Sequence, residues 1–260
     1  MQARPGQAVL SPLPPVIRPG ALAIRLRRNH RLVMDKLFSP TLALHIFCGF
    51  ALVVVGLLPI LTRKGSRLHR LSGRTFVILM SVLLAAAWTM TIVHFNAYFA
   101  ALSATATLTL FSGVRVLRRK RPDLDPRQRA TALDWIVTLT VLAIGGWVLF
   151  LVVTGQTGRN GAVAMALVYG AFTLGGWDLW RFARPMDWPF SPDLWTYEHL
   201  LKMLGAYGAV LSAFSGNFLT FLPTPWSQLW PTLVFQPIAL IWIAGLILRR
   251  RRRDQALVSA

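Results

Sequence analysis

Apolar runs long enough to cross a membrane alternate with short polar connections along most of this chain. An α-helix of about 20 apolar residues spans a bilayer core ~30 Å thick. The runs, nearly free of charged residues, lie at 41–62, 75–95, 97–117, 131–153, 162–183, 196–222 and 228–248. The pattern therefore predicts an all-α fold, a polytopic transmembrane helix bundle of seven spans within residues 41–248.

Basic residues are concentrated in alternate connections and in the C-terminal segment 249–260. The basic connections are 63–74, 118–130 and the flank of the fifth run at 181–184, whereas the intervening connections hold Arg159 alone. Membrane proteins keep an excess of Lys and Arg in their cytoplasmic loops. We therefore predict a cytoplasmic C-terminus and, because seven spans are an odd number, an N-terminus outside.

The N-terminal segment 1–40 conflicts with this orientation, because residues 1–36 contain seven Arg or Lys. One explanation is a basic tail that lies at the membrane interface. The other is that translation begins at Met34, which leaves only Lys36 outside. We favour the second explanation because it removes the conflict with the charge rule.

Composition agrees with a membrane protein. Hydrophobic residues make up 55% of the chain and charged residues 14%, whereas a soluble domain carries about 25% charged residues. We attribute the net charge of +19 to loops held on the cytoplasmic side of the membrane rather than to a nucleic-acid-binding surface. We therefore expect the lipid bilayer as partner and no nucleic acid. The single cysteine, Cys48, excludes an intrachain disulfide. These features predict a multi-pass protein of the bacterial inner membrane, alone, as a homo-oligomer or with other membrane subunits.

Four histidines fall into two groups by their expected depth in the membrane. Counted at ~1.5 Å per residue from the basic ends of their runs, His45 and His94 lie at nearly the same depth near the outer face. His69 and His199 lie near the inner face. Two bis-histidine haem b sites would place electron carriers at both faces. Alternatively, these histidines only bind backbone carbonyls or lipid phosphates, or they serve another metal or proton role.

A second group of polar residues gathers near the predicted cytoplasmic face. Asp178 and Arg181, and likewise Glu198 and Lys202, are spaced to pair on one helix face. Such pairs stabilise helix ends, or they belong to a polar pocket that binds an anionic headgroup or substrate, a role that suits arginine. The predicted pocket residues are Lys64, Arg70, Asp178, Arg181, Glu198 and Lys202.

The first run contains an early histidine and spaced glycines, and it is followed by a K-G-x-x-x-H-R-x-x-G loop and later by an EH-x-x-x-M helix start. These residues are His45, Gly49, Gly56, Lys64, Gly65, His69, Arg70, Gly73, Glu198, His199 and Met203. With this pattern, residues 41–222 resemble a family of bacterial predicted membrane proteins without an established activity. The resemblance implies a membrane fold and no particular reaction. We expect Gly65 and Gly73 to form tight turns, and His69 and Arg70 to join Glu198 and His199 in a cytoplasmic site.

Three functional hypotheses follow. The first is a histidine-lined redox or metal site for transmembrane electron transfer. The second is a transporter or a binder of anionic lipids or small molecules that uses the polar pocket. The third is a non-catalytic assembly subunit. The sequence contains no G-x-S-x-G elbow, HExxH helix or phosphate loop, so it suggests no hydrolase and leaves open whether the protein is an enzyme.

Overall fold

The computed structural model describes residues 38–156, 161–186, 192–219 and 221–258. The chain divides into two units, residues 1–40 and 41–260, and the architecture below is that of the second. Its regular secondary structure, in the described ranges, is entirely helical. This confirms the predicted all-α class. The predicted basic tail and the alternative start at Met34 lie, apart from residues 38–40, outside the described residues.

The helices follow the predicted apolar runs. A first helix occupies residues 38–55. The remaining α-helices are α2 (Leu57–Leu61), α3 (Arg67–Val93), α4 (Ala97–Arg115), α5 (Ala132–Val153), α6 (Gly161–Ala183), α7 (Leu194–Phe218) and α8 (Trp226–Val258). Two short 3-10 helices, η1 (Val116–Arg118) and η2 (Pro126–Gln128), lie in the connection between α4 and α5.

Six described helices are long and apolar enough to cross a membrane. They cover Phe38–Leu61, Arg67–Val93, Ala97–Arg118, Pro126–Val153, Gly161–Ala183 and Trp226–Leu257. The predicted sixth span corresponds to α7, which is not among them and carries Glu198 and Lys202. The fold is thus a membrane-type helix bundle, and its seventh span stays a prediction.

Local signals decide where the helices begin. Ser66 caps α3, since its hydroxyl accepts a hydrogen bond from the backbone N–H of His69 (3.1 Å). The first helix turns of α3 therefore include residues predicted as loop. Gly65 adopts a left-handed φ of 76°, which confirms the expected tight turn there. Gly73 lies inside α3, so the expectation that it also forms a turn was wrong.

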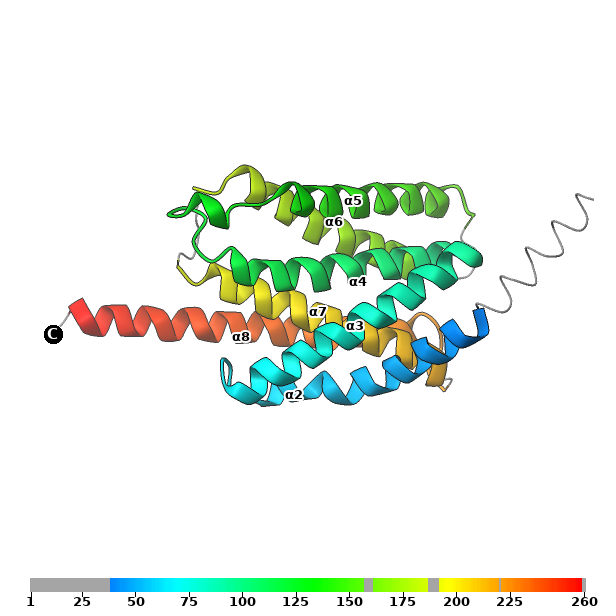
Figure 1. Ribbon diagram of the computed structural model, residues 1–260, viewed down its shortest axis with the longest axis horizontal. Helices are drawn as coiled ribbons and strands as arrows, with labels where there is room; N and C mark the ends of the chain where they lie inside the picture. The colour runs from blue at the N-terminus through cyan, green and yellow to red at the C-terminus, as the bar shows by residue number, and fades with distance from the viewer. Residues whose placement is uncertain (1–37, 157–160, 187–191, 220, 259–260) are drawn as a thin grey trace, which may run out of the picture. The chain divides into compact units, whose positions relative to one another are not determined.

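The central helix of the bundle is α4, which contacts α3, α5, α6 and α7 (Figure 1). In its most apolar window 61% of the residues are buried, against 11–33% in the other five candidate spans. Its alanines, including Ala100, Ala101 and Ala104, lie in the core. In a membrane the hydrophobic effect does not drive helices together, so association depends on close packing, which small side chains allow. Among the other described helices, the main contacts join α5 to α6, α7 to α8 and α2 to α3.

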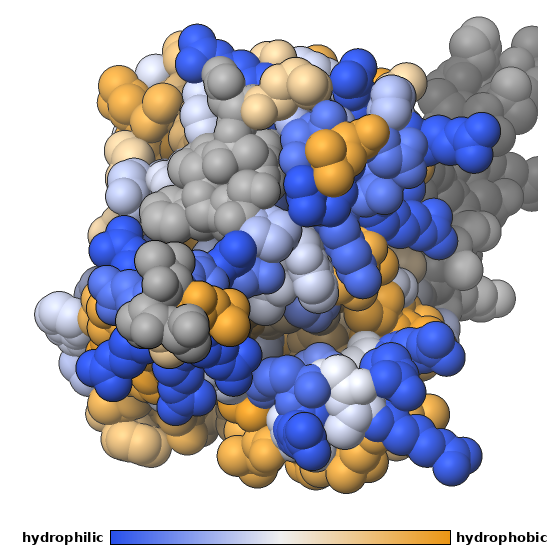
Figure 2. Space-filling model, turned by 90° about the vertical axis from the view of Figure 1, so that its left-hand side faces the viewer, coloured by the Kyte–Doolittle hydropathy of each residue, from blue (hydrophilic) through white to orange (hydrophobic). Residues whose placement is uncertain are grey.

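The basic connections meet at one end of the bundle. The α2–α3, α4–α5 and α6–α7 connections and the end of α8 all lie toward the left in Figure 1. Viewed from that side, this end is covered largely by hydrophilic residues (Figure 2). Residues 249–258 continue α8 as a helix, and Arg249 and Arg251–Arg253 are exposed. We call this end of the bundle the basic end.

Candidate functional site

Several charged side chains are buried near the basic end, between α4, α5, α6 and α7. They are Arg119, Asp134, Asp178, Arg181, Glu198 and Lys202, each at most 7% exposed. Moving a charged side chain from water into a protein interior costs roughly several kcal/mol unless a partner compensates the charge. In a membrane protein, such groups mark functional sites by default.

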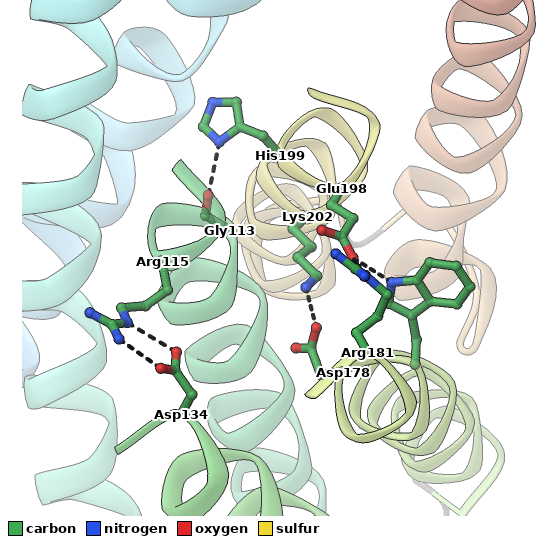
Figure 3. A network of polar contacts seen from close by, with 9 residues as sticks. Gly113, Arg115, Asp134, Asp178, Arg181, Glu198, His199 and Lys202 are labelled. Carbon is green, nitrogen blue, oxygen red and sulfur yellow. Dashed lines mark hydrogen bonds and ion pairs between the residues drawn. The ribbon is translucent and has the colours of Figure 1, made fainter. Parts of the chain in front are cut away.

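Two ion pairs join α6 to α7 (Figure 3). The Lys202 ammonium donates to Oδ1 of Asp178, and these side chains are 2% and 1% exposed. One turn away, Nε of Arg181 donates to Oε1 of Glu198 at 2.9 Å. The hydrogen bonds in these pairs run between the helices. The sequence had suggested pairs within each helix, and the structure differs because these faces of α6 and α7 meet.

Neighbouring groups hold this arrangement in place. The indole N–H of Trp177 donates to the same Glu198 oxygen at 2.7 Å. An ideal Cβ built on Gly113 of α4 would lie 3.1 Å from Cβ of Lys202. Glycine at this position therefore lets α4 approach α7 where the lysine is buried.

A third ion pair fastens α4 to α5. Nε and Nη2 of Arg115 donate to the two carboxylate oxygens of Asp134 at 2.9 and 2.6 Å. Asp134 also accepts from the backbone and hydroxyl of Thr131 (both 2.8 Å) and completes a capping box at the start of α5. Both oxygens of this carboxylate accept hydrogen bonds from the protein, so the pair has a structural role. Neither member of this pair was among the residues predicted from the sequence.

Arg119 is the buried cation that sequence analysis missed. Its guanidinium lies over the ring of Phe182 with Cζ 4.6 Å from the ring centroid. Its side chain is hydrogen-bonded to no residue that the structure describes, and its buried Nε is unpartnered. The sequence presents it as one of several loop arginines, and only folding distinguishes it from exposed Arg118 and Lys120.

A small cavity of about 20 Å³ opens beside Arg119. It is lined by Arg119, Pro122, Gln128, Arg129, Ala130, Asp178, Arg181, Phe182, Pro185 and Glu198. Such a volume holds about one water molecule or one oxygen of a larger group. Oδ2 of Asp178, the oxygen that does not bind Lys202, is buried and has no hydrogen-bond partner in the described ranges. We call this space the arginine cavity.

Two predicted pocket residues lie elsewhere. Lys64 donates to the backbone oxygens of Pro59 (2.7 Å) and Ile60 (2.8 Å), and its ammonium lies 4.4 Å from the centroid of Trp242. Partial burial lowers the pKa of this amine. Arg70 donates to the carbonyl of Gly65. Both side chains stabilise the α2–α3 turn and neither lines the arginine cavity. The described structure shows no hydrogen bond or ion pair between Arg70 and Glu198, so the predicted site that combined them stays a prediction.

The outer histidines are not brought together. Nδ1 of His45 contacts the carbonyl of Leu83 in α3 at 3.3 Å, whereas His94 caps the C-terminus of that helix. Leu83 and His94 are separated by about three turns, or ~16 Å along the axis. His45 and His94 therefore do not share one metal in this arrangement. Depth counting missed this because it ignores the tilt of one helix against another.

The inner histidines lie near enough for His69 to influence His199 electrostatically, and each ring contacts a backbone carbonyl. Nδ1 of His69 contacts the Pro59 carbonyl at 3.1 Å, and Nδ1 of His199 contacts the Gly113 carbonyl at 2.8 Å. A carbonyl only accepts, so each Nδ1 carries the proton and the neutral ring keeps a lone pair on Nε2. Among the described residues, no group of three or more His, Cys, Asp or Glu side chains is placed to hold a metal ion.

The chain matches no model of a protein family, no curated protein and no solved structure. The motif resemblance in residues 41–222 therefore stays an expectation. The geometry of the buried polar groups is what distinguishes the functional hypotheses.

Proposed function

We propose that this protein is a multi-pass membrane protein that binds a phosphoryl group or similar oxyanion in the arginine cavity. The observation that carries the proposal is Arg119, a guanidinium only 7% exposed that forms no ion pair with a carboxylate in the described part of the chain. Asp134 attracts it at longer range, but this carboxylate is already paired with Arg115. A buried charge without a close counter-ion is costly, and an anion bound in the cavity would compensate it.

The charges around the cavity favour an anion. Four cationic side chains line or adjoin it in the described structure, those of Arg119, Arg129, Arg181 and Lys202, and two carboxylates oppose them, those of Asp178 and Glu198. Both carboxylates already have cationic partners, so neither pairs with Arg119 or with the exposed Arg129. Arg129 donates to the Pro122 carbonyl and to the Met186 sulfur, which are both uncharged. Arginine suits anion binding because its planar donors match the oxygens of a phosphate.

The cavity size favours a tetrahedral oxyanion at the surface of the bundle. The enclosed space accepts about one oxygen. The rest of the ligand would lie at the mouth, where Arg129 is exposed. Inorganic phosphate and the phosphate of a lipid headgroup both meet this requirement.

We further propose the topology that gives this site its location. The basic end faces the cytoplasm by the charge rule. Helix α7 also crosses the membrane, between α6 and α8, which brings the number of spans to seven and leaves the N-terminus outside. Its two buried charges are compensated by Asp178 and Arg181 of α6, which offsets their cost inside a membrane. In a bacterium this membrane would be the inner membrane.

A histidine-lined redox or metal site is the second candidate. It is restricted to His69 and His199, because His45 and His94 are kept apart along α3. The Nδ1–carbonyl contacts of His69 and His199 are of the kind that orient metal-binding imidazoles. Bound haem would supply one-electron chemistry, and these residues would hold it through Nε2.

Titration of the purified protein in phosphatidylcholine nanodiscs with inorganic phosphate tests the leading proposal. We expect binding in wild type and a loss of affinity of about tenfold or more in Arg119→Gln, the effect of losing a charged hydrogen bond. The matched control is Arg118→Gln, the exposed neighbour, which should bind as wild type does.

A second arm separates the two sources of the ligand. Nanodiscs that contain phosphatidic acid should weaken the apparent phosphate affinity if the lipid headgroup occupies the site, and leave it unchanged if only free phosphate enters. The proposal fails if wild type binds neither probe, or if Arg119→Gln binds phosphate as tightly as Arg118→Gln.

A further inference from the structure

The second unsatisfied atom in the arginine cavity is an acceptor, and it restricts the ligand further. Asp178 is 1% exposed, its Oδ1 binds Lys202, and its Oδ2 has no described hydrogen-bond partner. An ionised carboxylate accepts hydrogen bonds and donates none. A ligand oxygen placed beside Oδ2 is therefore attracted when it carries a hydrogen and repelled when it does not.

The cavity thus combines two opposite requirements. Arg119 offers an unpartnered N–H to an anionic oxygen, while Asp178 needs a donor. A water molecule would satisfy each atom separately. A hydroxyl oxygen of an oxyanion can do both at once, because it accepts from Arg119 and donates to Asp178, and the charge of the oxyanion compensates that of Arg119.

We infer that the arginine cavity selects oxyanions that carry a hydrogen-bond donor, such as hydrogen phosphate, over fully deprotonated oxyanions such as sulfate. This inference rests on the proposed function, and Asp178 is its selectivity-determining residue. Phosphate and sulfate have nearly the same tetrahedral shape, but near neutral pH phosphate keeps a hydrogen and sulfate has none. A site that leaves a buried polar group unpaired with the wrong ligand discriminates strongly.

Lys202 contributes to this discrimination through its ion pair with Asp178. Its ammonium is 2% exposed and donates to Oδ1 of Asp178, so Oδ2 is the oxygen of this ion pair that is left without a described partner. The carboxylate therefore presents an acceptor to the cavity rather than a hydroxyl. A neutral side chain at position 178 would remove the repulsion toward sulfate.

Four oxyanions separate the role of the hydrogen from the role of size. Phosphate and arsenate keep a hydrogen, whereas sulfate and selenate have none, and arsenate and selenate are the larger member of each kind. For wild type in phosphatidylcholine nanodiscs, we expect phosphate and arsenate to bind at least about tenfold more tightly than sulfate and selenate. Equal affinities for phosphate and sulfate overturn the inference and leave the anion site standing. Binding of none of the four overturns the proposed function as well.

A charge-neutral double variant tests Asp178 itself. Asp178→Asn combined with Lys202→Met removes both members of the buried pair, so no unpaired charge is left to unfold the bundle. We expect this variant to bind sulfate nearly as well as phosphate. The control, Asp123→Asn, changes a carboxylate that pairs with Arg121 in the loop and should keep the wild-type preference. Retained selectivity in the double variant contradicts the role of Asp178.

Discussion

The guanidinium of Arg119 lies over the aromatic ring of Phe182, which holds a buried cation at the edge of the arginine cavity. A cation above a ring face is worth roughly 0.5–2 kcal/mol, depending on its desolvation. The ring supplies no hydrogen-bond acceptor for the guanidinium N–H groups. Phe182 therefore positions Arg119 without using the donors that a ligand would need.

Substitution of Phe182 tests this positioning. In Phe182→Leu, apolar packing remains but the ring face is lost, so phosphate affinity should fall by roughly twofold to tenfold. Phe182→Tyr keeps the ring and should bind as wild type does, in the same nanodisc titration. If both variants bind phosphate equally, the ring does not position Arg119.

The buried pair of Lys202 and Asp178 predicts a non-additive effect on stability. Lys202→Met alone leaves the Asp178 carboxylate buried without its partner and should destabilise the fold by about 3–5 kcal/mol. The double variant with Asp178→Asn should be less destabilised, because no unpaired charge remains. Thermal unfolding of both variants in detergent measures this difference, and additive losses would contradict it.

Gly56 is predicted to be intolerant of a side chain. An ideal Cβ at this position would lie 2.3 Å from Cδ2 of Tyr207, a ring that is 3% exposed and whose hydroxyl donates to the Val53 carbonyl at 2.8 Å. Gly56→Ala should therefore destabilise the fold by roughly 1–3 kcal/mol. Gly73→Ala is the control, since nothing lies within 4 Å of its added Cβ; it should leave the unfolding temperature unchanged or raise it.

The topology can be tested by labelling single cysteines with an impermeant maleimide in whole cells. Native Cys48 is only 3% exposed, so background labelling should be low. With seven spans, Thr224→Cys should be labelled from outside, whereas Arg127→Cys should be labelled only after the cells are broken. Protection of Thr224→Cys in intact cells would contradict a crossing by α7.

The histidine hypothesis now predicts an asymmetric result. If the purified protein, expressed with ample haem, shows a Soret band that shifts on dithionite reduction, the band should be weakened by His69→Ala or His199→Ala. His94→Ala should leave it intact, because His94 lies far from His45 along α3. A colourless protein that binds no metal would remove this candidate.

Hydropathy and charge order in the sequence determined the helical class, the helix positions and the basic end. These properties depend on short segments of the chain. The length of an apolar run predicts a membrane-spanning helix, and the number of basic residues in each connection predicts its side of the membrane. The boundary at Ser66 was less predictable, since basic residues such as Arg67 and Arg70 form helix as readily as loop once the cap is made.

Only the tertiary structure decided which polar groups meet. Helix rotation and tilt set the partners of Asp178 and Glu198 across α6 and α7, and they place His45 against Leu83 rather than His94. The burial of Arg119 depends on how the α4–α5 connection folds over Phe182. Small residues such as Gly113 and Ala104 allow several close packings, so one chain pattern is compatible with different sets of buried contacts. The candidate site is a product of that packing.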